Sequence, residues 1–458
     1  MIIVTILLGL VGLGLVVVLH ELGHFAAARA MGVEVEAFSV GWGPKIASFK
    51  RGKTEWRFSA LPLGGYCKMK GEESFQKALE DKAEEIPRES GTFYGAAPWR
   101  RIVISLSGPI ANVIFAVIVF MVVSTIAYTT PTYSNRIVLL SEYDIGSAKL
   151  SSYPADRAGL KTGDRILEAD GKEINDFSDL LQEITLSANK SVDLKIERNG
   201  SVIEKSVTPM LDKDTGAGLL GVTYWADPIV GEISKGSAAQ IAGLEAGDRI
   251  VSLNGKNVRH AVEFLSILNV DKPERVKIGI ERAGAPLELS AVLSWSDQGK
   301  SNLGLRFQTQ THSVRPATSF SGAVNAGFAE TLSTFNATCK GLASLVQGVN
   351  LLKALSGPAR ITYMVGQSAT EGIQNSGSGG LAVPLSFLAF LSIGLFIMNL
   401  LPIPALDGGQ ILMFLVEAIR KRAMRPITIY RYQAIGATFI LALLVIATVG
   451  DFLFFAAK

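Results

Sequence analysis

Long uncharged apolar stretches alternate along the chain with regions of ordinary polar patterning. A helix needs roughly 20 apolar residues to cross a hydrocarbon core of about 30 Å. Four stretches come close to that length or exceed it: residues 2–19 with the HELGH that follows, 102–128, 381–406 and 432–450. No basic residue precedes the first stretch, so we interpret it as a retained span rather than a cleaved signal peptide. The pattern predicts an α-helical polytopic membrane protein with four transmembrane helices.

Strand-like alternation follows the first span. Residues 41–72 alternate polar and apolar side chains around the turn KRGK, which predicts one or two β-hairpins. A sheet attached to a membrane helix must be covered by protein or line a wet cavity, so we expect a membrane-associated sheet. A soluble cytoplasmic hairpin fits the same alternation. Residues 72–91 are charged and lack periodic apolar spacing, which predicts a mobile connector.

An internal repeat occupies the long region between the second and third spans. AGLKTGDRILEADGKEI at 158–174 recurs as AGLEAGDRIVSLNGKNV at 242–258, with seven of the first nine positions identical. The A-G-L-x-x-G-D-R-I pattern resembles bacterial PDZ domains, which bind extended peptides at a sheet edge. The resemblance implies two tandem PDZ-like α+β domains that bind peptide C-termini or periplasmic proteins. A duplicated β-rich spacer with an empty groove is the alternative.

These patterns give a predicted domain organisation. In order, it comprises the first span with HELGH (1–30), the hairpin region and linker (31–97), the second span (98–130), two PDZ-like domains (131–222 and 223–308), a membrane-adjacent helical region (309–380), the third span (381–414), a basic loop (415–431) and the fourth span (432–458).

Lys and Arg beside the spans predict the orientation in the membrane. Basic residues concentrate after the first span, at Arg100 and Arg101 before the second, and in 415–431 after the third. Both basic loops are therefore expected in the cytoplasm, with both termini and the 130–380 region in the periplasm. HELGH then lies toward the cytoplasmic side.

Net charge and cysteine content exclude some classes of protein. A net charge of +3 without a basic tract interleaved with aromatics argues against nucleic-acid binding. Cys67 and Cys339 lie far apart and fit no CxxC pattern, so we expect neither a disulfide nor a metal pair.

Two of the four histidines of the chain flank a glutamate in HELGH. On a helix, His20 and His24 lie on one face and Glu21 stands about 100° away. Two imidazoles in this arrangement bind one zinc ion, while the carboxylate reaches the attacking water. The alternative is a buried ion cluster without a metal, but an unpartnered buried carboxylate costs several kcal/mol.

A third ligand is expected from the third span, which ends FIMNLLPIPALDGGQ. Asp407 is its only charged residue, and Pro402 and Pro404 should unwind the chain just before it. The alternative interpretation of Asp407 is a carboxylate at a helix end near the membrane surface.

HELGH, SGPIANVIF in the second span and NLLPIPALDGG in the third together resemble the site-2 protease family of intramembrane zinc metalloproteases. The resemblance implies one zinc ion per chain, bound by His20, His24 and Asp407, with Glu21 as the general base. It also implies cleavage of single-pass membrane proteins in the bilayer of the bacterial inner membrane, including anti-sigma factors and signal-peptide remnants. Residues linked to substrate by the resemblance are Asn399, Pro402, Asn112, Phe58, Gly64, Gly65 and Tyr66. For Asn112, an interhelical hydrogen bond is an equal alternative.

Two other classes of function stay open. A non-catalytic adaptor that holds partners through its PDZ-like copies has no need of Glu21. A metal transporter usually shows paired inverted repeats and broken spans, whereas this chain has only an extramembrane repeat and one Pro-x-Pro break.

Overall fold

The computed structural model describes residues 2–143, 152–296, 299, 301–314, 316–345, 347–374 and 378–456. It divides into two compact units. One contains Met1–Tyr128 and Val314–Lys458, and is called the membrane unit below. The other contains Thr129–Ser313 and is called the repeat unit.

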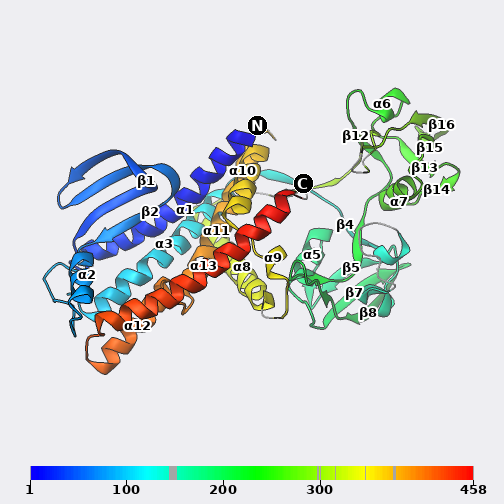
Figure 1. Ribbon diagram of the computed structural model, residues 1–458. Helices are drawn as coiled ribbons and strands as arrows, with labels where there is room; N and C mark the ends of the chain where they lie inside the picture. Colours follow the sequence, from blue (N-terminus) through cyan, green and yellow to red (C-terminus); the bar gives the residue numbers. More distant parts are fainter. Residues whose placement is uncertain are drawn as a thin grey trace. The chain divides into compact units, whose positions relative to one another are not determined.

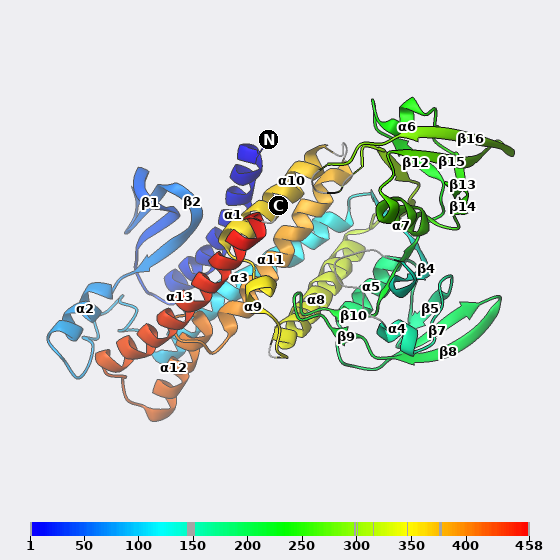
Figure 2. The same ribbon diagram turned by 45° about the vertical axis from the view of Figure 1, so that its right-hand side comes forward.

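Four helices of the membrane unit are the ones, among the described residues, long and apolar enough to cross a bilayer. They are α1 (Ile2–Ala30), α3 (Pro98–Ser124), α11 (Ala382–Leu400) and α13 (Pro426–Ala456). They lie side by side with α8 (Phe320–Leu345) and α10 (Pro358–Gln374) in Figures 1 and 2. The four predicted spans are thus confirmed as helices.

Small residues bring the helices of the membrane unit together. Gly23 of α1 leaves room for the Ser107 carbonyl of α3, which a Cβ would approach to 2.4 Å. Gly9 of α1 and Gly366 of α10 lie against the backbone carbonyls of Thr362 and Thr5 in the same way. Close backbone approach through small residues is the usual means by which membrane helices associate, because lipid provides no hydrophobic drive between them.

The predicted hairpin region is one antiparallel pair, β1 (Val35–Arg51) and β2 (Thr54–Met69), in which both strands fold back. Residues 35–40 pair on one side with 65–69 and on the other with 55–58, which in turn pairs with 45–51. Phe58 therefore has partners on both sides, Val40 and Ala47. Phe58, which the resemblance links to substrate, is therefore inside the sheet, where it has no free edge for an added strand. The edges of this sheet are 65–69 and 45–51.

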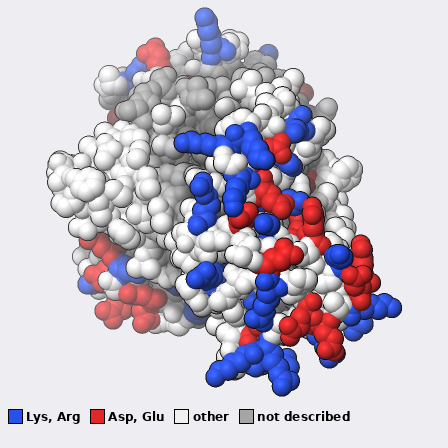
Figure 3. Space-filling model, turned by 90° about the vertical axis from the view of Figure 1, so that its left-hand side faces the viewer, with Lys and Arg blue, Asp and Glu red and all other residues white. Residues whose placement is uncertain are grey.

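The sheet carries both apolar and charged side chains at its surface. Trp42, Ile46 and Phe49 are exposed. Basic residues are paired with acids, as in the Lys45–Glu55 contact of 2.8 Å. Figure 3 shows the same intermixing of positive and negative side chains over one side of the face it views, beside a broad uncharged surface.

The prediction of a mobile connector at 72–91 is wrong for residues 72–80, which are helical. They form α2 (Glu72–Glu80), whose Phe75 and Ala78 are buried against Met413 and Phe414 of α12 (Asp407–Arg420). The spacing of these two residues is helical, but two apolar positions are too few to reveal a helix in a charged stretch. The predicted loop 415–431 is also shorter, because α12 continues to Arg420 and α13 begins at Pro426.

The repeat unit holds two similar sheets, each with its own core. The helices and strands of the first module and its surroundings are β3 (Tyr128–Thr132), β4 (Ser134–Leu139), η1 (Leu140–Glu142), α4 (Pro154–Arg157), β5 (Arg165–Ala169), β6 (Lys172–Glu173), α5 (Phe177–Thr185), β7 (Val192–Arg198), β8 (Ser201–Val207), β9 (Met210–Leu211), β10 (Gly218–Leu219) and β11 (Val222–Trp225). The second contains β12 (Val230–Ile233), α6 (Ala238–Ile241), β13 (Arg249–Leu253), β14 (Lys256–Asn257), α7 (Ala261–Asp271), β15 (Arg275–Arg282), β16 (Ala285–Val292) and β17 (Leu305–Phe307), followed by β18 (Gln310–Val314). The remaining short elements, α9 (Leu351–Ala354) and η2 (Ser378–Leu381), belong to the membrane unit.

The repeated sequence motif has the same structural role in both modules. Its aspartate is buried and receives two hydrogen bonds of 2.7 Å from an arginine, in the pairs Asp164–Arg198 and Asp248–Arg282. The same arginine donates to a carbonyl of the AGL turn, at Gly159 or Gly243. The motif therefore fixes a turn to a strand, and the likeness to PDZ domains stays a prediction.

His260 joins the two modules. It is fully buried, its Nδ1 accepts from the Glu263 amide at 3.2 Å, and its Nε2 lies 3.1 Å from the Tyr143 hydroxyl of the first module. Because Nδ1 accepts a hydrogen bond, the ring is neutral with its proton on Nε2. Burial lowers the pKa of His260 to about 4.

We predict that the repeat unit loses stability as the pH falls below about 6.5. The unfolded chain then binds a proton that the folded His260 rejects, so the unfolding free energy should fall by up to about 1.4 kcal/mol per pH unit. Denaturant titrations of fragment 129–313 between pH 7 and pH 5 measure this slope. The fragment carries His312→Gln, so that His260 is the one histidine left in its sequence. Adding His260→Gln should flatten it, and an unchanged slope would show that another group is responsible.

Candidate metal centre

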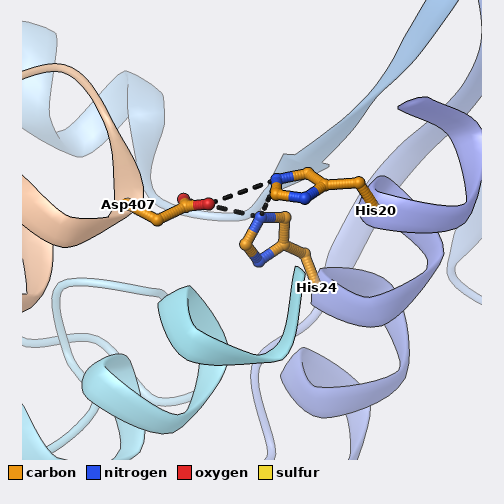
Figure 4. Close-up of side chains that lie close together, drawn as sticks. All are labelled: His20, His24 and Asp407. Atoms are coloured by element: carbon orange, nitrogen blue, oxygen red, sulfur yellow. Dashed lines mark hydrogen bonds and ion pairs between the residues drawn. The ribbon is translucent and has the colours of Figure 1, made fainter. Parts of the chain in front are cut away.

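His20 and His24 lie on consecutive turns near the end of α1. Both side chains are buried, at 7% and 8% exposed. The 3.6-residue period of the helix places both rings on one face, as the sequence predicts. Figure 4 shows the two rings directed from α1 toward Asp407.

Asp407 arrives from a break in the third span. Helix α11 ends at Leu400, and α12 begins at Asp407 itself. The turn between them places Ala405 at a φ of 75°, a left-handed conformation that L-residues rarely adopt. Gly408 is packed against the Leu400 carbonyl, which a Cβ would approach to 2.3 Å. The predicted unwinding at the prolines is confirmed, and it directs the carboxylate at the histidines.

The three groups form a small triangle. His20 Nε2 lies 3.2 Å from Asp407 Oδ2 and 3.1 Å from His24 Nε2, and His24 Nε2 lies 3.5 Å from Asp407 Oδ1. Ligands bound tetrahedrally to zinc at about 2.0 Å stand about 3.3 Å apart. The observed separations match that spacing. Among the described residues, these three make up the group that could hold a metal ion.

The chemistry of the donors also fits zinc. His24 Nδ1 lies 2.8 Å from the Ile104 carbonyl, which can only accept, so the ring proton is on Nδ1 and Nε2 keeps its lone pair. Asp407 Oδ2 is buried without a hydrogen-bond partner. A carboxylate oxygen left in this state is costly unless a cation neutralises it.

Gly108 of α3 makes room for the rings. A Cβ at this position would lie 2.4 Å from His24 Nε2 and 2.8 Å from His20 Cε1. Any larger residue would displace the two histidine rings. Gly108 stands in the quoted SGPIAN motif, but its contact crosses between helices and leaves no periodic signal in the sequence.

A buried ion pair holds α12, and with it Asp407, against α3. Arg101 and Glu417 are 3% and 5% exposed, and the guanidinium donates to both carboxylate oxygens at 2.7 and 3.1 Å. The guanidinium also lies over the Phe414 ring. Removing one partner of such a pair costs about 3–5 kcal/mol. Arg101 is therefore a structural residue, not one of the free surface charges used to predict orientation.

The donor triangle opens into a cavity of about 610 Å³. Its walls come from α1, α2, α3, α11, α12, α13 and the 65–69 edge of the sheet, and include Glu21, Cys67, Glu72, Gln76, Asn399, Gln410 and Gln433. The backbone amide of Cys67 is the sheet group that interacts with the Glu21 carboxylate. The sequence did not reveal that α2 contributes to this wall.

The other predicted substrate residues are distributed unevenly. Asn399 lines the cavity, and Asn112 contacts His20. Gly64 and Gly65 pack against Val17 and Val18 of α1, so their immediate role is close packing of sheet and helix. The Tyr66 hydroxyl accepts a hydrogen bond from Arg57. Among the described residues, the cavity lining does not include Tyr66, Phe58 or Pro402, which the resemblance also links to substrate.

With this geometry established, comparison with known proteins identifies the class. The model of Peptidase family M50 matches residues 8–446, and the chain belongs to that family. It is a zinc metalloprotease of the site-2 type, which confirms the predicted family, enzyme class and cofactor.

Three relatives match almost end to end. The chain is 40% identical over 437 residues to a "Putative zinc metalloprotease" of Treponema pallidum (strain Nichols), covering 95% of this chain and 96% of that protein. A protein of the same name from Borreliella burgdorferi is 30% identical over 442 residues, 95% of each chain. The Regulator of sigma-E protease RseP of Escherichia coli (strain K12) is 29% identical over 466 residues, 97% of each.

Proposed function

We propose that this membrane protease binds one zinc ion through His20, His24 and Asp407 and cleaves single-pass membrane proteins within the bilayer. The observation that carries the proposal is the buried triangle of two Nε2 atoms and one carboxylate, spaced 3.1–3.5 Å apart on apolar helices. Zinc in such a site acts as a Lewis acid toward the scissile carbonyl and makes water a usable nucleophile near neutral pH.

Glu21 is the proposed general base. It neighbours His20 on α1 and lines the cavity without belonging to the donor triangle. From there its carboxylate takes a proton from the attacking water and returns it to the leaving amine. Neither an adaptor nor a metal carrier needs a carboxylate at this position.

We predict that Glu21→Gln abolishes cleavage but keeps about one zinc per chain, because the amide accepts no proton and replaces no ligand. Asp407→Asn should lose activity and also retain metal poorly, since a neutral amide is a weaker zinc donor. Metal analysis of the purified variants, beside cleavage of a tagged single-span substrate in proteoliposomes, measures both effects. Full zinc content and full activity in the Asp407 variant would exclude Asp407 as a ligand.

The sheet edge at 65–69 is the proposed place where substrate is held. A helical substrate buries its peptide groups in intrahelical hydrogen bonds, so it must be extended before water can attack. Cys67, Lys68 and Met69 line the cavity, and among the described residues no strand pairs with their outer side. An extended substrate segment added here would run beside Glu21.

A photo-cross-linking amino acid at each edge of the sheet tests this route. In the Glu21→Gln background, which should bind without cleaving, a cross-linker at Lys68 is expected to capture the substrate. The matched position is Ser48, exposed on the opposite edge at 45–51. Equal capture at both positions, or capture at Ser48 alone, would contradict strand addition at 65–69.

The repeat unit is proposed to select substrates by size. It is inserted between the second and third spans, and its first and last strands, β3 and β18, pair with each other, so the chain enters and leaves it at one place. By the charge pattern it lies in the periplasm, opposite the catalytic side. It then contributes no catalytic group, but it obstructs a substrate whose periplasmic domain is still folded. Substrates such as anti-sigma factors and signal-peptide remnants are admitted after trimming.

We predict that replacing residues 131–308 by a short flexible linker leaves zinc bound and allows cleavage of substrates with intact periplasmic domains, which the wild type rejects. Paired full-length and trimmed substrates, expressed with each protease and followed on gels, give the answer. A zinc-loaded deletion variant that still rejects the full-length substrate refutes the size filter. If that variant instead loses cleavage of the trimmed substrate, the repeat unit delivers substrates by docking.

A further inference from the structure

Asn112 is a fully buried amide in the middle of α3, with one polar contact to the metal centre. In the structure its amide nitrogen, Nδ2, lies 3.2 Å from His20 Nδ1. Its Oδ1 is buried without a hydrogen-bond partner. Its backbone carbonyl accepts a hydrogen bond from Ser392 of α11 at 2.9 Å, which ties the two helices together independently of the side chain.

The two ends of an amide have nearly the same shape, so the contact fits two opposite hydrogen bonds. If the NH₂ group faces His20, Nδ1 must accept, and the ring proton moves to Nε2. If the carbonyl oxygen faces His20, Nδ1 donates and Nε2 keeps a lone pair. In either orientation one end of the amide stays unpaired, so the hydrogen bonds of Asn112 alone do not decide between them.

The surroundings of His20 Nε2 decide between the two orientations of the Asn112 amide. His20 Nε2 lies 3.1 Å from His24 Nε2 and 3.2 Å from Asp407 Oδ2, at one corner of the donor triangle. A proton there would occupy the position through which the ring binds a metal, and imidazole ligands bind as neutral rings with the other nitrogen protonated. We infer that Asn112 is a positioning residue, whose Oδ1 accepts the Nδ1–H of His20 and keeps Nε2 free for zinc.

Helix α3 thus supports both histidines along one face. Ile104, Gly108 and Asn112 are spaced four residues apart, which aligns them on consecutive turns. The Ile104 carbonyl accepts from His24, and Gly108 leaves space for both rings. In the inferred orientation of its amide, Asn112 accepts from His20. Each ring then has one fixed proton and one free nitrogen directed at the same point.

The inference rests on the proposed ligand role of His20, and zinc affinity of the purified full-length protein tests it. Loss of such a supporting partner typically lowers metal affinity 10–100-fold. Asn112→Leu, similar in size but without a hydrogen-bonding group, is expected to show a loss of about that size in competition with a chelator. Asn112→Asp is expected to stay within a few-fold of wild type, because its carboxyl group keeps an oxygen that can accept from Nδ1–H whether or not it is ionised.

The control is Ser392→Ala, which removes the hydrogen bond to the Asn112 backbone without touching His20; it should leave zinc affinity unchanged. An Asn112→Asp variant that binds zinc as weakly as Asn112→Leu would show that the amide donates, and would overturn the inference. So would wild-type affinity in Asn112→Leu. Should Asn112→Leu fail to fold, Asn112→Asp alone still decides. His20→Ala is measured in parallel, since unchanged zinc affinity there refutes the ligand assignment itself.

Discussion

The close approach of α3 to α1 is the constraint on which the candidate metal centre depends. A side chain at Gly108 would overlap both histidine rings, and one at Gly23 would overlap the α3 backbone. Because the two helices lie so close together, the Ile104 carbonyl of α3 reaches His24 Nδ1 and the Asn112 side chain reaches His20 Nδ1. The candidate metal centre is therefore organised by close packing of helix backbones, which lipid alone would not drive.

The proposed third donor, Asp407, is positioned in a different way. Asp407 is not held by the helix that crosses the membrane, but begins a new helix after a strained turn. That new helix, α12, is held against α3 by the Arg101–Glu417 ion pair and against α2 by apolar contacts. Contacts distant in sequence thus determine where a single carboxylate lies, as expected for a site that tolerates little displacement.

Much of this arrangement can be predicted from the sequence. The four apolar stretches specify their own helices, and His20, Glu21 and His24 are spaced by the helix that carries them. Asp407 stood out because it was the one charge in an apolar span, next to two prolines. What could not be read depends on contacts between segments: the gap at Gly108, the burial of Arg101, and the strands that fold back and place Phe58 inside the sheet. The spacing of apolar residues predicts which face of a helix or strand is buried, but not which other segment of the chain packs against that face.

The duplicated ion pairs of the repeat unit carry a consequence for how the chain folds. In both modules the arginine lies 34 residues after the aspartate, and the bonded groups are equivalent. Arg282 would therefore suit Asp164 nearly as well as Arg198 does, and tandem copies with interchangeable contacts are prone to misassembly. Order of synthesis reduces this hazard, since Arg198 leaves the ribosome long before Arg282. Strand β11, which pairs with β4 at the edge of the first sheet, also precedes the second module in the chain.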